Sequence, residues 1–88
     1  MLNQLDENLK AQDKVVINMI YYLNKKLPKV DNNMNGYIKY LEETTELKSN
    51  RIKTILTINK VRRITIKEIF EISKALNIEM EELFKEKK

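Results

Sequence analysis

Residues 37–56 read YIKYLEETTELKSNRIKTIL, and this stretch decides the predicted fold. Apolar residues recur at helical spacing on both sides of its centre: Ile38, Leu41, Ile52, Ile55 and Leu56. A short link, Glu46-Leu47-Lys48, separates the two halves. Two short helices joined by about three residues are typical of a helix-turn-helix. The stretch therefore predicts one helix over about 37–45 and a second that begins at Ser49, its expected N-cap.

The segment before this stretch predicts a longer first helix. From Asp13, the expected N-cap, to Leu27 an apolar stripe comprises Val16, Ile17, Ile20, Leu23 and Leu27. Pro28 ends the pattern, because the residue before a proline avoids the helical conformation. Residues 1–12 are open to two interpretations. They form either a frayed N-terminal arm or, through Leu2, Leu5 and Leu9, the start of one helix over about 2–27 with a seven-residue repeat.

The segment after this stretch carries the clearest helix signals. Thr65 and Glu68 match a capping box, and Ile64 precedes it as one half of a hydrophobic staple. We expect a buried stripe made by Ile66, Ile69, Phe70, Ile72, Ser73 and Leu76. Asn77 is the expected left-handed terminator. A last helix over about 79–85 would bury Met80, Leu83 and Phe84, which gives five helices and no strand.

Composition excludes several classes of function. The 88 residues suffice for one domain, with 42% hydrophobic and 34% charged side chains. Cysteine and histidine are absent and there is one glycine, so disulfides, Cys/His zinc sites, His-activated nucleophiles and glycine-rich phosphate loops are excluded. Glu42 and Glu46 lie one helical turn apart without further ligands, and a solvated acidic face is the preferred interpretation. We expect no enzyme activity, no cofactor and no metal.

The chain also lacks sequence signals for a membrane or for export. No apolar run approaches the roughly 20 residues that a membrane span needs. The first residues lack the basic and apolar regions of a signal peptide. We therefore expect a cytoplasmic protein with no membrane contact and no small-molecule ligand.

Positive charge is concentrated in one window of the chain. Residues 48–67 contain seven basic side chains and no acidic one, whereas the net charge of the whole chain is +4. The flanking segments are near neutral or acidic. One basic window of this kind is typical of a nucleic-acid-binding face, although a solvated basic surface without a partner would give the same pattern.

These patterns together resemble the phage-repressor and Cro-like (XRE-type) helix-turn-helix family, which has the lambda-repressor-like fold. Residues 37–56 align without gaps to its helix-turn-helix, residues 65–84 are similar to its C-terminal ending, and the likeness covers roughly residues 14–85. The chain departs from the family in its longer connections before Tyr37 and after Leu56, in Ile38 or Gly36 where the family often has a glutamine, and at two glutamates. Glu42 stands where the family usually has a small alanine, and Glu46 where it usually has the glycine of the turn.

The resemblance implies an all-α, five-helix DNA-binding domain over residues 13–88, preceded by the arm 1–12. It implies a transcriptional repressor that binds operator DNA as a homodimer, since one short helix reads only half a site. For contacts to base edges we expect Ser49, Asn50, Arg51, Lys53 and Thr54, all on the outward face of the second helix. For contacts to the phosphate backbone we expect Lys48, Lys60, Arg62 and Arg63.

A protein-binding function is the alternative. Small phage and mobile-element proteins of this fold act as antitoxins, antirepressors or inhibitors of host defence enzymes. The two glutamates near the turn and the long connection before Tyr37 would suit a surface that binds a protein partner.

Overall fold

The computed structural model describes residues 2–57 and 63–85, with residues 2–12 described by their backbone alone. These residues form four α-helices: α1 (Leu2–Lys26), α2 (Met34–Thr44), α3 (Ser49–Leu56) and α4 (Ile66–Ala75). Two short 3-10 helices, η1 (Lys29–Asp31) and η2 (Met80–Phe84), complete the order. The described residues contain no strand, which confirms the all-α class. The predicted fifth α-helix is wrong, because this segment is η2, in which the Glu82 amide bonds back three residues to the Glu79 carbonyl (3.0 Å).

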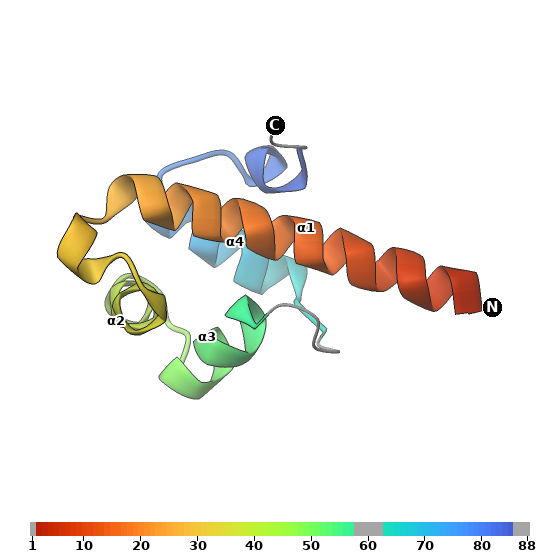
Figure 1. The fold of residues 1–88 in the computed structure, drawn as a ribbon, viewed down its shortest axis with the longest axis horizontal. Coiled ribbons are helices and arrows are strands. Elements are labelled where there is room, and N and C mark those ends of the chain that lie inside the picture. The colour runs from red at the N-terminus through yellow and green to blue at the C-terminus, as the bar shows by residue number, and fades with distance from the viewer. Residues whose placement is uncertain (1, 58–62, 86–88) are drawn as a thin grey trace.

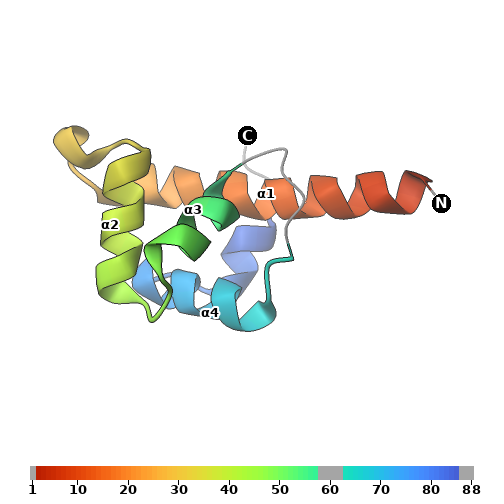
Figure 2. The same cartoon turned by 90° about the horizontal axis from the view of Figure 1, so that it is seen from below.

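α1 lies across the rest of the molecule. In Figure 1, α2 and α3 lie on one side of it, η2 lies on the other, and α4 runs behind it. Figure 2 shows the same arrangement from below, with the N-terminal part of α1 extending past the other elements. The structure therefore consists of a helical body, built on the second half of α1, and a projecting helix end.

α1 is one continuous helix, which decides between the two interpretations of residues 1–12. The predicted N-cap at Asp13 is wrong, since residues 2–26 contain no proline or glycine to break the helix before Pro28. Val16, Met19 and Leu23 are fully buried. Ile17, expected in the same stripe, is 51% exposed because it lies about 100° around the helix from Val16. No helix in the described part of the chain is long and apolar enough to cross a membrane.

α2 begins at Met34, three residues before its predicted start, because Asn33 caps it. The Asn33 side chain accepts a hydrogen bond from the Gly36 amide (2.9 Å). Gly36 also lies against the backbone of η1, where a Cβ atom would lie 2.0 Å from the Asp31 carbonyl oxygen. The glycine therefore permits the close approach of η1 to the first turn of α2.

α4 begins and ends as its sequence predicts. Thr65 and Glu68 form the reciprocal capping box (Thr65 N to Glu68 Oε1, 2.9 Å; Glu68 N to Thr65 Oγ1, 3.1 Å). Asn77 has a φ of 58°, and the Ile78 amide bonds to the Ser73 carbonyl (3.0 Å), which is a Schellman ending. The predicted stripe was too wide, because Ile66 and Phe70 are 63% and 49% exposed.

The C-terminal segment is held against the middle of α1 by a buried amide. Asn18 is 1% exposed and donates to the carbonyls of Leu83 (2.7 Å) and Lys85 (2.6 Å). Leu83 is fully buried, whereas Phe84, expected to be buried with it, is 47% exposed. η2 therefore closes the core through Leu83, through the partly buried Met80 and through the hydrogen bonds from Asn18.

Candidate nucleic-acid interface

α3 has a buried face and an exposed face, as a recognition helix must. Ile52, Ile55 and Leu56 are buried and anchor the helix in the core. On the opposite face Asn50 and Lys53 are exposed, one helical turn apart. The structure thus leaves an amide and an ammonium group directed away from the core on the same face of α3.

The start of α3 differs slightly from its prediction. The N-cap is Lys48, which makes no side-chain capping bond, and Ser49 is the first helical residue rather than the cap. Ser49 is half-buried, whereas Lys48 is exposed. A helix N-terminus whose cap supplies no side-chain acceptor favours an external anion such as a phosphate.

Two threonine hydroxyls of this region are bonded to the helix backbone. Thr54 Oγ1 donates to the Asn50 carbonyl (3.0 Å), and Thr57 Oγ1 donates to the Lys53 carbonyl (2.7 Å). Thr54 is half-buried. The Thr54 hydroxyl can still accept a hydrogen bond from a ligand, but its own proton is donated to the Asn50 carbonyl.

Arg51 is not the freely exposed side chain that the sequence predicts. Its Nε and Nη2 atoms donate to Glu68 Oε2 (2.6 Å) and Oε1 (2.8 Å), and Nη2 also donates to the Arg63 carbonyl (2.6 Å). The side chains of Arg51 and Glu68 are 35% and 13% exposed. Arg51 therefore joins α3 to the first turn of α4 through its bidentate pair with Glu68, and to Arg63, two residues before the N-cap Thr65. A base contact by Arg51 stays a prediction.

The same pair changes the electrostatics of the region. The hydrogen bond from Arg51 lowers the pKa of Glu68, and the bond to Glu68 raises the pKa of Arg51. Glu68 is the first acidic residue after the basic window. In space it lies against that window and neutralises one of its charges, so the positive surface is smaller than the sequence predicts.

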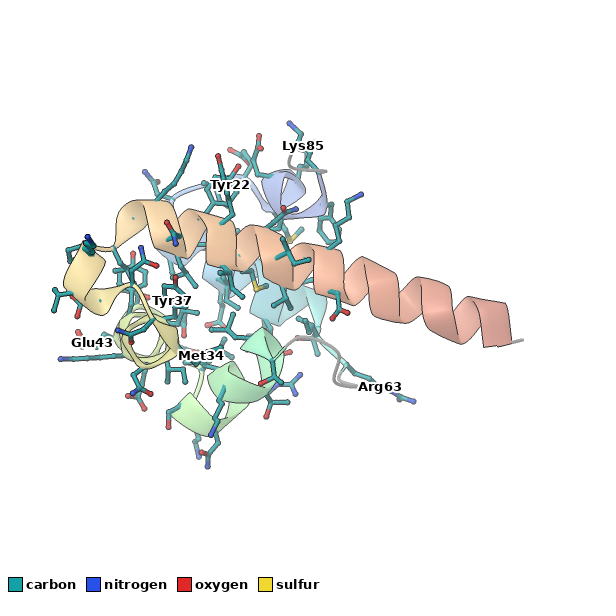
Figure 3. The ribbon with its side chains drawn as sticks, viewed as in Figure 1. Tyr22, Met34, Tyr37, Glu43, Arg63 and Lys85 are labelled. Carbon is teal, nitrogen blue, oxygen red and sulfur yellow. The ribbon has the colours of Figure 1, made fainter. Side chains whose placement is uncertain are left out.

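The remaining basic residues of the prediction fall into two groups. Lys48, Lys53 and Arg63 are exposed. Figure 3 shows the Arg63 side chain extending away from the body on the α3 side, opposite Lys85. Lys60 and Arg62, the other two expected phosphate contacts, lie outside the described residues.

The α2–α3 turn closes without a glycine. The Thr45 hydroxyl donates to the Leu41 carbonyl (2.5 Å) and accepts from the Leu47 amide (3.1 Å). Among the described residues other than glycine, only Asn77 has a positive φ, so Glu46 needs no left-handed conformation. Glu42 is exposed and does not lie between the helices. Both residues are therefore compatible with the turn between α2 and α3.

Comparison with protein-family models, with curated proteins and with solved structures finds no match for this chain. The function must therefore be argued from the residues themselves.

Sequence reasoning did not find the Arg51–Glu68 link or the Asn18 clamp. The first joins residues 17 positions apart and the second joins residues more than 60 apart, so no local pattern marks them. One signal was available for the first, because Glu68 had already been assigned to a capping box. A cap glutamate next to a basic segment is well placed to bind an arginine as well.

Proposed function

We propose that this chain is a sequence-specific DNA-binding regulator of the phage-repressor and Cro-like type, which inserts α3 into the major groove of operator DNA. The observation that carries the proposal is the division of α3 into a buried aliphatic face and an exposed polar face. Binding at a promoter would block transcription by occupancy. One helix of this length contacts half a site, so the active form is a homodimer.

Each exposed residue of α3 and its flanks has a chemical role in this proposal. Asn50 pairs in bidentate fashion with adenine, and Lys53 donates to the acceptors of guanine. Lys48 and Arg63 neutralise phosphates on the two sides of α3, with Lys60 and Arg62 as further candidates in the connection. Ser49 and Thr54 border the same face and suit contacts to phosphate or base oxygens.

Arg51 has a positioning role in the same proposal. Its bonds to Glu68 and to the Arg63 carbonyl fix the orientation of α3 relative to α4. Two further donors on its guanidinium, those of Nη1, are available to a phosphate or base. Its substitution is therefore a poor test of base recognition, because stability and binding would change together.

The proposal is tested by selection from random double-stranded DNA at several salt concentrations. We expect enrichment of a short sequence with dyad symmetry and an affinity that falls steeply with salt. The Asn50→Ala/Lys53→Ala variant should lose the enrichment and keep its thermal stability. Lys26→Ala removes one positive charge from the exposed end of α1 and should keep the enrichment. Salt-dependent binding without any enriched sequence would contradict the proposal.

A protein partner is the second candidate, supported by one observation. Ile66 and Phe70 are exposed on one face of α4, and Phe70 borders a groove with Lys74 and Met80. Contiguous exposed apolar surface is typical of a site that binds a protein partner. Phe70→Ser should leave DNA selection unchanged whether or not the chain binds a protein partner. Loss of a biological effect in that variant, with DNA selection intact, would favour the protein-binding function.

A further inference from the structure

The apolar pattern on the buried face of α1 continues into the N-terminal part of the helix, which extends beyond the body. Leu2, Leu5 and Leu9 precede Val16, Met19 and Leu23 by multiples of seven, and these three are fully buried. A straight helix drifts only about 20° per heptad, so positions 2, 5 and 9 lie on the side of α1 that the body occupies farther along. Residues 2–12 extend past the other elements in both views (Figures 1 and 2).

The projecting segment extends a helix whose second half is anchored in the core. Pairing with a partner would stabilise it further, because helical turns without tertiary contacts are marginal in water. A row of leucines at heptad spacing is the pattern by which such helices pair. We propose that residues 2–12 of two copies of this chain pair in antiparallel orientation and form the dimer interface.

The body of the molecule excludes the parallel arrangement. In a parallel pair the partner helix would continue alongside α1 past residue 12, against the face of Val16 and Met19. Both residues are 0% exposed because the core of the same chain already covers that face. Antiparallel pairing directs the partner helix away from the body.

One antiparallel register matches the length of the projecting segment. With the two-fold axis at residue 7, Leu5 of one copy lies level with Leu9 of the other, and Leu2 lies level with Gln12. Each projecting segment then covers the other, and the two bodies lie beyond opposite ends of the pair. The contact is isologous, as in most homodimers, because each copy uses the same surface.

The segment around Met80 and Phe84 in η2 is another surface through which two copies could pair, and it is less suitable than residues 2–12. Leu83 is fully buried in the core of its own chain and Met80 is partly buried. η2 is a five-residue 3-10 helix, which presents no heptad face. Phe84 is the large apolar side chain that η2 exposes (47%), whereas the α1 segment carries three leucines in one row, so the α1 segment is the better dimer surface.

The arrangement also determines the spacing of the two α3 helices, a step that rests on the proposed function. α1 packs on the body from Val15 to Leu23, and the centre of this part lies about 18 Å along the helix from residue 7 at 1.5 Å per residue. The two bodies are then about 36 Å apart along α1, close to the 34–36 Å of one DNA turn. The two-fold axis runs across the paired helices and leaves both α3 helices on one side.

Oligomeric state without DNA tests the pairing. Sedimentation of the full chain over a micromolar concentration series should show a monomer–dimer equilibrium. Leu5→Lys/Leu9→Lys should be monomeric at every concentration and keep the thermal transition of the body. Gln4→Lys/Ala11→Lys adds the same charge to the same segment at positions outside the leucine row, and it should dimerise like the parent chain. A monomeric parent, a dimeric leucine variant or a monomeric control would each overturn the proposal.

Orientation is tested separately by spin labels. The chain has no cysteine, so Lys26→Cys provides one labelling site per copy. Antiparallel pairing about residue 7 places the two labelled positions about 57 Å apart along the helices. A distance near the separation of two packed helices, about 10 Å, would show parallel pairing and overturn the proposal.

The outcomes separate this inference from the proposed function. A dimer with the long spin-label distance and no selected DNA sequence would support the pairing and contradict operator binding. A monomeric chain that selects a DNA sequence would support operator binding and contradict the pairing. With both correct, the selected half-sites should be spaced by one helical turn, and the leucine variant should retain binding to a single half-site only.

Discussion

Arg51 and Glu68 lie in a bidentate ion pair, with Nε to Oε2 at 2.6 Å and Nη2 to Oε1 at 2.8 Å. The same Glu68 carboxylate accepts from the Thr65 amide (2.9 Å) and so belongs to the cap of α4. The Glu68 side chain thus serves two purposes, since it caps the N-terminus of α4 and holds α3 through Arg51. The orientation of α3 is therefore coupled to the integrity of the α4 cap.

Arg51→Ala should lower the free energy of unfolding by about 1–3 kcal/mol, since it leaves the largely buried Glu68 carboxylate without its charged donor. Arg51→Lys should restore only part of this loss, because an ammonium group cannot reproduce the bidentate geometry. Urea denaturation of both variants measures the effect. Lys53→Ala, on the exposed face of α3, is the control and should be close to neutral. Equal stability of the Arg51→Ala variant and the parent chain would contradict the structural role of the pair.

The lowered pKa of Glu68 predicts a loss of stability in acid. The ordinary pKa is 4.5, and the folded state holds it below that value because Arg51 donates to the carboxylate. A lowered pKa contributes stability that is present above pH 4.5 and is lost as the pH falls through the folded value. Glu68→Gln should therefore have a shallower decline of stability below about pH 4.5. Unfolding free energies of the two chains from pH 7 to pH 2 provide the comparison, and parallel curves would show that Glu68 does not contribute.

Gly36→Ala should be destabilising by about 1–3 kcal/mol, as overpacking usually is. The added Cβ would lie 2.0 Å from the Asp31 carbonyl oxygen and 2.7 Å from its carbon, and both are backbone atoms that move only with η1. This cost exceeds the gain of about 1 kcal/mol that alanine normally brings to a helix. Asn35→Ala, at the adjacent exposed position, should not show this loss in thermal unfolding. A stabilised Gly36→Ala variant would mean that η1 does not lie against α2 as described.

Asn18→Leu should lower stability by about 1–3 kcal/mol, mainly because the Leu83 carbonyl loses its donor in a buried site, whereas Lys85 is exposed and its carbonyl can bind water instead. Leucine has a similar size, so most of the loss would come from hydrogen bonding rather than from a cavity. Amide exchange should increase most in residues 80–85, which the Asn18 side chain holds against α1. Ile17→Ala, one position away and half exposed, is the matched control and should leave exchange in that segment unchanged.

Features coded by neighbouring residues could be predicted from the sequence. Thr65 and Glu68 stand three apart in a capping box, and Asn77 follows the last buried position of α4, so both ends of this helix were correct. The buried faces of α2 and α3 were also found by their spacing. The widths of the stripes were overestimated at Ile17 and Phe70, because periodicity identifies an apolar face without locating its edges.

Features that depend on distant residues could not be predicted. Asn18 resembles an ordinary polar position on α1 until the Leu83 carbonyl is placed beside it. Arg51 resembles a base-contacting residue until Glu68 is placed beside it. The continuity of α1 was left open because the absence of a breaker before Pro28 permits a long helix without requiring one. The hydrogen-bond partner of a polar side chain depends on which distant residues the folded structure brings beside it.

The Asn18 clamp has a consequence for the nascent chain. α1 is synthesised well before the carbonyls that Asn18 binds, which belong to residues 83 and 85. At about 5–20 residues per second, the apolar face of α1 waits for several seconds before η2 can close over it. Translation that stops before residue 83 would release a chain whose first helix has no cover at this end of the core. Such a product would be a substrate for chaperones and proteases, so the first helix is protected only after η2 has been synthesised.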